Sequence, residues 1–554
     1  MRSFNSLTSA FSVGLTCLLL PTLVGEEPKI GKPQTLDPIA KLQAEAAATN
    51  QATWGHWGPA TDKYSSWTTH SNRLIPIYTF GWKLDSVCGE NSIYRSPEKL
   101  TEVYGFLPTA TVNPTADYCD QTDIYRLQQA AIAAGKKRII LFIFDGMDWQ
   151  STRAAAIAKT GEVQYDQGRG RGLAFQDYRG VETDFGAMVT SPHNNGTNVN
   201  VNKQTVLNPG GSTPGGYDVT RAGATAWAEF PDPLYPNASL ESNNHAYTDS
   251  SSSATSMTSG IKTYNNGVNV DFSGREVVPL ARVLQDDGFA VGVVTSVPIS
   301  HATPAAAYAS NVHRDDYQDL TRDMLGLPSI YHPGGLSGLD VIIGGGWGEP
   351  RDKDGAQGDN FVPGNRYLTS EDLAKIDRAN GGKYVVAQRT HGRTGEDVLD
   401  EAVKQAIAGK HRLLGYFGVT GGHLPFRTAD GRYDPVASIG NATTAKAEEY
   451  SRDDVAENVS LSRMAVSAVE VLDARSDRWW LMIEAGDVDW ANHSNNIDNS
   501  IGAVLSGDEA FAELTQWIEN HGGWDETCLF LTADHGHYLI LDKPEALTGV
   551  SPTN

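Results

Sequence analysis

The sequence contains little cysteine and fewer basic than acidic side chains. Only four cysteines occur in 554 residues, and their arrangement does not suggest a zinc ribbon. Lysine and arginine number 44 against 67 aspartates and glutamates, so the formal net charge is −23. A surface this acidic repels nucleic acid and anionic membranes over about a Debye length. Neither is therefore an expected partner.

The N-terminal hydrophobic run is too short to cross a bilayer comfortably. It covers residues 10–20 and follows Arg2, a pattern typical of a secretory signal peptide over residues 1–25. An uncleaved N-terminal anchor is the alternative. Export predicts a secreted or periplasmic protein without stable membrane insertion. There Cys88 and Cys119 can pair, although the sequence alone does not establish this.

The chain has ample material for a large core, since 40% of its residues are hydrophobic. Short apolar runs typical of buried parallel strands lie at 139–144, 290–295, 341–343, 413–417, 480–483 and 529–531. Helical patterns alternate with them, notably at 276–287 and 455–472. This alternation predicts an α/β fold, a three-layer αβα sandwich around a mostly parallel central sheet.

Composition also divides the chain into regions. Residues 131–554 are predicted to form the main domain, with Gly-rich loop insertions at 190–244 and 344–365. Residues 26–130 lack clear alternation of strands and helices, and we interpret them as an N-terminal extension packed on that domain.

Acidic and imidazole side chains follow three of the apolar runs. They are Asp145 after the first run, Glu484 after the run at 480–483, and Asp534 with His535 after the last. Because the carboxyl ends of parallel strands meet at one edge of a sheet, these groups are expected to converge. Surface acids and a core histidine are the alternative for each motif alone, but their shared placement favours a metal cluster.

Asp489 and His493 lie four residues apart beyond Glu484. On a helix both would face the same way, which suits two ligands of one Zn²⁺ ion.

Ser250 opens a run of small residues that ends at Gly260, and this run predicts a helix with Asp249 and Ser250 at its N-terminus. Backbone N–H groups and the helix dipole would attract phosphate there. Serine is a weak nucleophile and no histidine precedes it in a protease pattern, so a metal is its expected activator. A serine-rich helix cap without catalytic role is the alternative.

Thr303 and Arg314 follow the run at 290–295. A threonine hydroxyl can bind Mg²⁺, and a guanidinium can hold two phosphate oxygens of a monoester dianion. The alternative for Arg314 is a surface ion pair with Asp315 or Asp316.

Together these motifs resemble those of alkaline phosphatases, in order, over residues 136–537. The resemblance rests on Phe144-Asp145-Gly146-Met147, Thr248-Asp249-Ser250, Lys262-Thr263-Tyr264-Asn265, His301-Ala302-Thr303-Pro304 to Arg314, Glu484 to His493, and Asp534-His535. It implies hydrolysis of phosphate monoesters through a phosphoserine on Ser250, with two Zn²⁺ ions and one Mg²⁺ ion as cofactors.

The resemblance also implies a role for each residue. The Mg²⁺ ligands would be Asp145, Thr303 and Glu484; the second Zn²⁺ would take Asp145, Ser250, Asp534 and His535; the first Zn²⁺ would take Asp489 and His493. Arg314 would clamp the phosphoryl group, and His301 would stand beside the Mg²⁺ site. Family precedent is a homodimer, and the N-terminal extension and loop insertions leave open whether this chain keeps that interface.

One ligand of the family pattern has no counterpart where it is expected. The family supplies a third protein ligand to the first Zn²⁺ from a histidine several dozen residues after the Asp-His motif, and no histidine follows His537 here. We expect His537 to take this place. The alternatives are Asp487, a water, another metal, or a histidine in a C-terminal part that this sequence does not include. Two further functions stay open: a phosphodiesterase or sulfatase-like relative, or a catalytically weak phosphate- or metal-binding protein.

Overall fold

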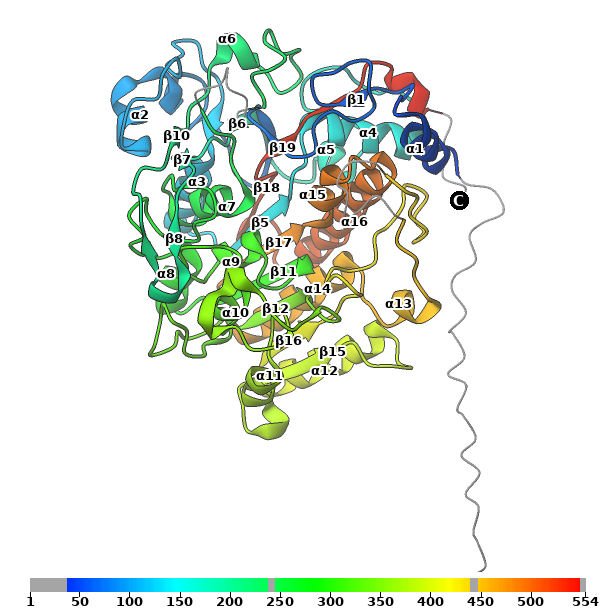
Figure 1. The fold of residues 1–554 in the computed structure, drawn as a ribbon. Helices are drawn as coiled ribbons and strands as arrows, with labels where there is room; N and C mark the ends of the chain where they lie inside the picture. Colours follow the sequence, from blue (N-terminus) through cyan, green and yellow to red (C-terminus); the bar gives the residue numbers. More distant parts are fainter. Residues whose placement is uncertain (1–36, 238–244, 439–446, 549–554) are drawn as a thin grey trace, which may run out of the picture.

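The computed structural model describes residues 37–237, 245–438 and 447–548. A ten-stranded sheet forms its centre (Figure 1). In sheet order the strands are β15 (Tyr384–Gln388), β16 (Arg412–Tyr416), β12 (Val341–Gly345), β11 (Ala290–Pro298), β17 (Trp479–Ala485), β5 (Arg138–Phe144), β18 (Thr527–Thr532), β3 (Ile75–Phe80), β6 (Thr183–Val189) and β4 (Cys119–Asp120). β3 is antiparallel to both of its neighbours, and the other pairings in this sheet are parallel.

The buried apolar runs form strands because both faces of the sheet are covered. Every side chain of β5, β17 and β18 is buried. The predicted α/β fold with a mostly parallel sheet is therefore confirmed, and all six predicted strands are present.

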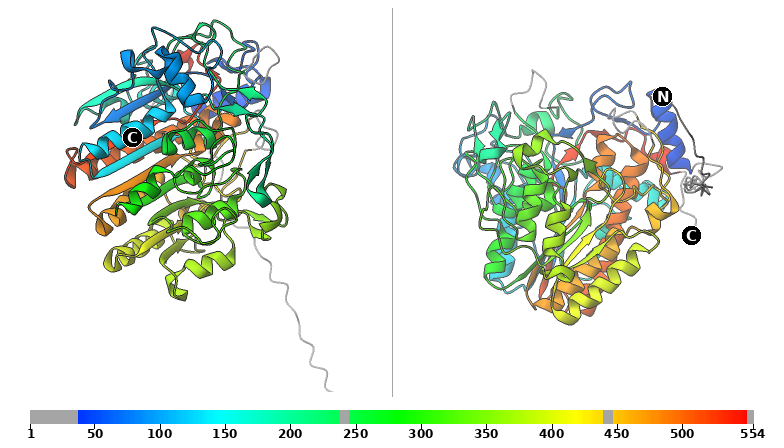
Figure 2. Two further views of the ribbon diagram at one scale, coloured as in Figure 1. Left: turned by 90° about the vertical axis from the view of Figure 1, so that its left-hand side faces the viewer. Right: turned by 60° about the horizontal axis from the view of Figure 1, so that its bottom comes forward.

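Helices pack in two layers, one on each face of the sheet (Figure 2). One layer contains α4 (Trp149–Thr160), α5 (Ala174–Asp177), α12 (Gly395–Gly409), α14 (Leu461–Arg475) and α16 (Ile497–Asn520). The other contains α3 (Gln121–Ala133), α7 (Ser250–Ser259), α8 (Leu280–Asp286), α9 (Ala302–Ala306) and α10 (Tyr317–Leu325). Further helices are α1 (Pro38–Thr49), α2 (Pro97–Tyr104), α6 (Val219–Ala222), α11 (Ser370–Ile376), α13 (Arg452–Ala456) and α15 (Asp487–His493).

Two predicted helices begin later than their apolar patterns suggested. α8 begins at Leu280 because Pro279 before it is extended, with φ −72° and ψ 155°. α14 begins at Leu461, where the Ser460 side chain accepts a hydrogen bond from the Arg463 amide and caps the helix.

The two ends of the described chain pair with each other through short antiparallel strands. β1 (His56–Trp57) pairs with β20 (Leu539–Ile540), and β2 (His70–Ser71) pairs with β19 (Gly536–His537). The segment predicted as an extension also contributes β3 and β4 to the central sheet. Early and late parts of the chain are therefore built into one core.

Short strands also occur within both predicted loop insertions. β7 (Asn194–Asn195) pairs with β10 (Thr213–Pro214), β8 (Val199–Asn200) with β9 (Thr205–Val206), and β13 (Pro350–Arg351) with β14 (Gly364–Asn365).

Residues 1–25 lie outside the described residues, so the signal peptide stays a prediction. Within the described part of the chain, no helix has the length and apolar character needed to span a membrane. Cys88 and Cys119 are both free thiols, and a hydrogen bond with Cys88 together with burial raises the pKa of Cys119.

Candidate active site

Four predicted ligands meet at the carboxyl ends of β5, β17 and β18. These residues, which we term the strand-end group, are Asp145, Glu484, Asp534 and His535, and all are fully buried. His535 Nε2 lies 3.2 Å from Asp145 Oδ1 and 3.6 Å from Asp534 Oδ2. The ligand atoms of Asp145, Asp534 and His535 all lie within 4.8 Å of one another, as in a cation site.

Ser250 begins α7 and faces the strand-end group. Its Oγ lies 3.2 Å from His535 Nε2 and 3.5 Å from Asp145 Oδ1. Asp249 caps the helix by accepting a hydrogen bond of 3.0 Å from the Ser252 amide. The serine hydroxyl therefore lies at the positive end of a helix dipole and beside a group of carboxylates.

Several buried oxygen atoms of this region have no hydrogen-bond partner among the described residues. They are Asp145 Oδ2, Thr303 Oγ1, Glu484 Oε1 and Asp534 Oδ2. Burying such acceptors unpaired is costly, and a hard cation would satisfy them. Burial raises the pKa of Glu484 to about 8, and burial with the neighbouring charge of Asp534 raises the pKa of Asp145. The donor set fits divalent cations.

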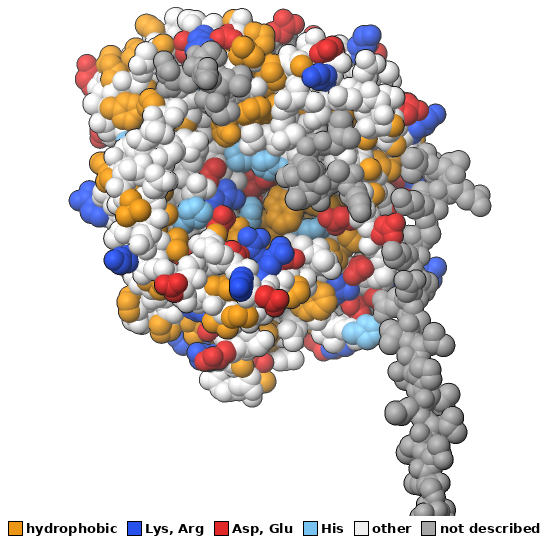
Figure 3. All heavy atoms as spheres, viewed as in Figure 1, with side chains coloured by type: hydrophobic (Ala, Val, Ile, Leu, Met, Phe, Trp, Pro, Cys, Tyr) orange, Lys and Arg blue, Asp and Glu red, His pale blue; other side chains and the backbone are white. Residues whose placement is uncertain are grey.

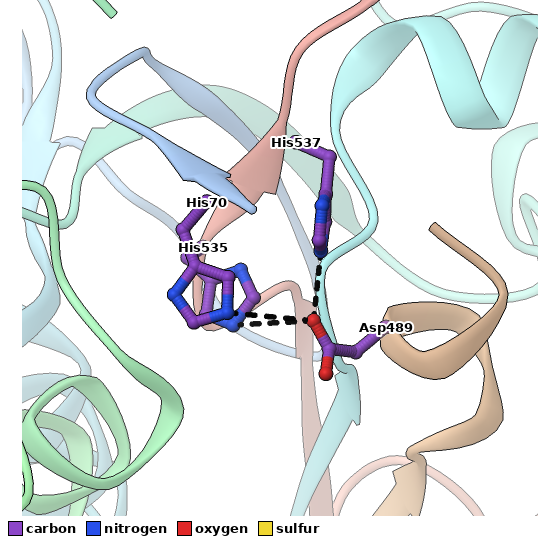
Figure 4. Close-up of side chains that lie close together, drawn as sticks. All are labelled: His70, Asp489, His535 and His537. Atoms are coloured by element: carbon purple, nitrogen blue, oxygen red, sulfur yellow. Dashed lines mark hydrogen bonds and ion pairs between the residues drawn. The ribbon is translucent and has the colours of Figure 1, made fainter. Parts of the chain in front are cut away.

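A second set of ligand-type residues surrounds Asp489, and Figure 4 draws two of them, His70 and His537, together with His535. We term it the imidazole group: His70, Asp489, His493 and His537. From Asp489 Oδ1 the Nε2 atoms of His537, His493 and His70 lie 2.7, 3.4 and 3.6 Å away. His535 connects the two groups, because its Nε2 lies 3.8 Å from the same oxygen and its ring stacks on that of His70 with centroids 3.7 Å apart.

The hydrogen bonds of His70 and His493 fix which ring nitrogen carries the proton. His70 Nδ1 lies 2.9 Å from the Thr248 carbonyl oxygen, and His493 Nδ1 lies 2.6 Å from that of Thr68. A carbonyl oxygen only accepts, so each Nδ1 donates. Burial lowers the pKa of both rings, so both are neutral and each Nε2 presents a lone pair.

These two lone pairs face each other across a short distance. His70 Nε2 and His493 Nε2 lie 3.2 Å apart, and two acceptors cannot hydrogen-bond to each other. A cation bound by both nitrogens and by Asp489 would relieve this repulsion, and N and O donors of this kind suit Zn²⁺.

His537 contacts Asp489 in a different way. At 2.7 Å its Nε2 donates a hydrogen bond to Asp489 Oδ1, while its Nδ1 has no partner among the described residues. The ligand atoms of His70, Asp489, His535 and His537 also lie within 4.8 Å of one another, so the position of His537 fits a cation ligand as well as a residue that orients Asp489. The other candidate, Asp487, accepts a hydrogen bond of 2.6 Å from Ser296 Oγ and is not part of the imidazole group.

Arg314 pairs with Asp249, the residue next to Ser250. Arg314 Nη1 lies 3.0 Å from Asp249 Oδ2, and Nη2 lies 3.5 Å from His301 Nε2. Burial raises the pKa of Asp249, but the charge of Arg314 and hydrogen bonds outweigh burial and lower this pKa to about 2. Burial and Arg314 lower the pKa of His301 to about 3. The guanidinium is therefore held beside Ser250, and the predicted alternative pairing with Asp315 or Asp316 is not formed.

Comparison with known proteins agrees with this arrangement. The model of the family described as alkaline phosphatase matches residues 225–546. The chain belongs to the alkaline phosphatase family. The matched stretch runs through Ser250 and Asp489 to His537, while His70 and Asp145 lie outside it.

Named relatives are about a quarter identical to the chain over the aligned residues. Alkaline phosphatase 4 of Bacillus subtilis is 25% identical over 293 residues, which are 52% of this chain and 49% of the relative. Alkaline phosphatase H of Pseudomonas aeruginosa is 27% identical over 311 residues, which are 54% of this chain and 59% of the relative. The human tissue-nonspecific isozyme of alkaline phosphatase is 26% identical over 330 residues, which are 55% of this chain and 56% of the relative. The matches thus span about half to three fifths of these relatives.

Solved alkaline phosphatases are also similar. The cold-active enzyme from Shewanella has a TM-score of 0.42 and 20% identity, over 72% of this chain and 68% of that chain. The Thermus thermophilus enzyme has a TM-score of 0.42 and 21% identity, over 73% of this chain and 60% of that chain.

His70 is the site residue that sequence reasoning missed. It lies more than 70 residues before the first recognised motif, in the segment interpreted as an extension. The available signal was the apolar run Ile75–Phe80, which begins five residues after His70 and forms β3. Histidine just before a buried strand is the same arrangement, with chain direction reversed, as the acids after β5 and β18.

Proposed function

We propose that this protein hydrolyses phosphate monoesters to an alcohol and inorganic phosphate, with a phosphoserine intermediate on Ser250. The observation that carries the proposal is the position of the Ser250 hydroxyl. It lies at a helix N-terminus, against a buried carboxylate and imidazole cluster, and next to the Asp249–Arg314 pair. Membership of the alkaline phosphatase family supports the same reaction.

Three cations complete this site in the proposal. Asp145, Thr303 and Glu484 would hold Mg²⁺; Asp145, Ser250, Asp534 and His535 would hold one Zn²⁺; Asp489, His493 and His70 would hold the other. When bound, the cations lower the pKa of the serine hydroxyl and stabilise charge on the entering and leaving oxygens.

The chain's own residues then perform the transfer. Ser250 Oγ attacks phosphorus, the bond to the leaving alcohol breaks, and the alcohol departs with a proton. Arg314 holds two phosphoryl oxygens, and the N–H groups of the first turn of α7 face the developing charge. Water then attacks the phosphoserine, releases phosphate and returns the hydroxyl of Ser250.

His70 removes the main reason to consider an inactive binding protein. That alternative rested on a missing third ligand at the first Zn²⁺, and His70 Nε2 faces Asp489 and His493 as such a ligand would. A phosphodiesterase or sulfatase-like activity stays the competing enzyme function. The paired Arg314 favours a dianionic phosphate, because a diester or sulfate carries one charge fewer.

The decisive experiment combines metal analysis with hydrolysis of p-nitrophenyl phosphate. We expect two zinc and one magnesium per chain, and a loss of about 10³-fold or more in kcat for Ser250→Ala. Ser256→Ala, a buried serine of the same helix that contacts Gln121, is the matched control and should retain activity. Faster hydrolysis of a diester or an aryl sulfate than of the monoester would contradict the proposal.

The homodimer implied by the family stays a prediction, which light scattering after size-exclusion chromatography checks.

A further inference from the structure

A cavity of ≈ 850 Å³ opens beside the phosphoryl-binding side chains. Its lining includes Ser250, Arg314 and His493, a group of rings, and the charged side chains of Asp315, Glu349, Arg351 and Glu448. Figure 3 shows this face of the molecule hollowed, with histidine, charged and hydrophobic side chains meeting in the hollow. In the proposed function Ser250, Arg314 and His493 face the phosphate, so the rest of the lining is available to the alcohol to which the phosphate is attached.

The rings that line this cavity form what we term the aromatic wall: His301, Tyr317, His423, Phe426 and Trp490. Trp490 lies at its centre, with its ring centroid 5.2 Å from that of His423 and 5.6 Å from that of His301. His423 stacks on Phe426 with centroids 4.2 Å apart. Because these rings come from four separate segments, their meeting here follows from the fold and from no local repeat.

Trp490 is only half-buried, whereas its helix neighbours Val488 and Ala491 are buried. Its indole N–H donates no hydrogen bond to another described residue, unlike those of Trp149 and Trp480, which donate to Gly168 and Gln128. A ring that packed the core alone would be covered. Trp490 instead lines the cavity with part of its ring exposed, and its indole N–H has no partner among the described residues.

The wall lies close to the phosphate clamp. Arg314 Nη2 is 3.5 Å from His301 Nε2, and the His301 ring contacts Trp490. A single imidazole therefore separates the guanidinium from the indole. A planar ring joined to the phosphate through a short sugar or directly through oxygen would reach the wall.

We propose that the aromatic wall binds the planar ring of the leaving group, so that the enzyme prefers monoesters whose alcohol carries a nucleobase or aryl ring over aliphatic ones. This inference rests on the proposed function. Stacking supplies the preference, since a flat π-surface gains contact with Trp490 that a chain of hydroxyl groups cannot make.

The test uses two substrates whose phosphate is attached to the same kind of hydroxyl group. Adenosine 5′-monophosphate and ribose 5-phosphate both release a primary 5′-hydroxyl, so they differ by the base and hardly by intrinsic reactivity. We expect kcat/KM to be about tenfold or more higher for the nucleotide. In Trp490→Leu the ratio should fall to near one, and in Phe426→Leu it should fall partly.

Trp227→Leu is the matched control, because Trp227 is a half-buried tryptophan that packs on Trp149 away from this cavity. It should keep the wild-type ratio. A wild-type ratio near one, or an unchanged ratio in both wall variants with native circular dichroism, would overturn the inference.

Adenosine binding, followed by quenching of tryptophan fluorescence, separates this inference from the proposed function. If the metal-loaded protein binds adenosine through Trp490 but hydrolyses neither substrate, the wall stands and the reaction is wrong. If it hydrolyses both substrates equally and adenosine quenches Trp490→Leu as strongly as wild type, the wall is wrong and the reaction stands.

Discussion

The strand-end group and the imidazole group lie side by side, but the chain builds them in different ways. The first collects residues from parallel strands in the middle of the sheet, each following its own apolar run. The second needs β2 from near the start of the described chain to pair with β19 near its end. One group follows from the sheet, and the other from closure of the chain ends.

This difference means that the two groups depend on different parts of the fold. Strand ends fix the strand-end group through the core itself, so its carboxylates are fully buried. The imidazole group lies at the cavity, where His493 and His70 hold their tautomers through backbone carbonyls of Thr68 and Thr248. Variants in the two groups should therefore lose different metals.

The largest effect is expected in the strand-end group. Asp145→Asn should lower kcat/KM by about 10³-fold or more, because Asp145 contacts both Ser250 and His535 and would serve two cations. Asp508→Asn, a buried acid paired with Lys159 outside the site, is the control. Steady-state kinetics with metal analysis decide it, and near-normal rates in Asp145→Asn would refute the shared-ligand role.

The next effect concerns the chain-end histidine. His70→Asn should remove about one zinc per chain and lower kcat/KM by about 10²-fold or more, while magnesium stays bound. His56→Asn, also a buried histidine of the N-terminal segment, should keep all metals. Full zinc occupancy in His70→Asn would show that another group closes this site.

His537→Asn should act more weakly than His70→Asn. Its hydrogen bond orients Asp489, and loss of such a partner typically weakens metal affinity by about 10- to 100-fold without removing the ligand. Titration of zinc into the metal-free protein measures this. A larger loss of affinity in His537→Asn than in His70→Asn would reverse the two roles.

The smallest effect is expected at Thr303. Thr303→Val keeps shape but deletes one oxygen, so magnesium affinity should fall about tenfold while both zinc ions remain. Thr321→Val removes another buried hydroxyl without a partner among the described residues and serves as control. Unchanged magnesium binding in Thr303→Val would exclude this ligand.

Local pattern was enough to predict the strand-end group, since apolar runs and the acids after them are adjacent in sequence. It was also enough for α7, which Asp249 caps, and for α15, which contains both Asp489 and His493. His70 was missed because it lies in the two-residue strand β2, which is held by its pairing with β19. Pro76 in the following strand β3 also argues against a central position for that strand.

The sequence does not predict the long-range strand pairings that bring the imidazole group together, of which one is the pairing of β2 with β19. β3 is placed by hydrogen bonds to β18 and β6, far away in the chain, and no local propensity encodes such a register. The proposed preference for His70 over His537 rests on hydrogen bonds to Asp489 and to backbone carbonyls, which are tertiary contacts.

The hydrogen bond between Ser71 Oγ and the His537 carbonyl oxygen joins residues 466 positions apart. At roughly 5–20 residues per second, a ribosome needs about half a minute to a minute and a half to make that stretch. The early half of this contact can therefore form only after the segment that carries His537 has been made. A product terminated before His537 therefore lacks the pairing of β2 with β19 that brings His70 to the imidazole group.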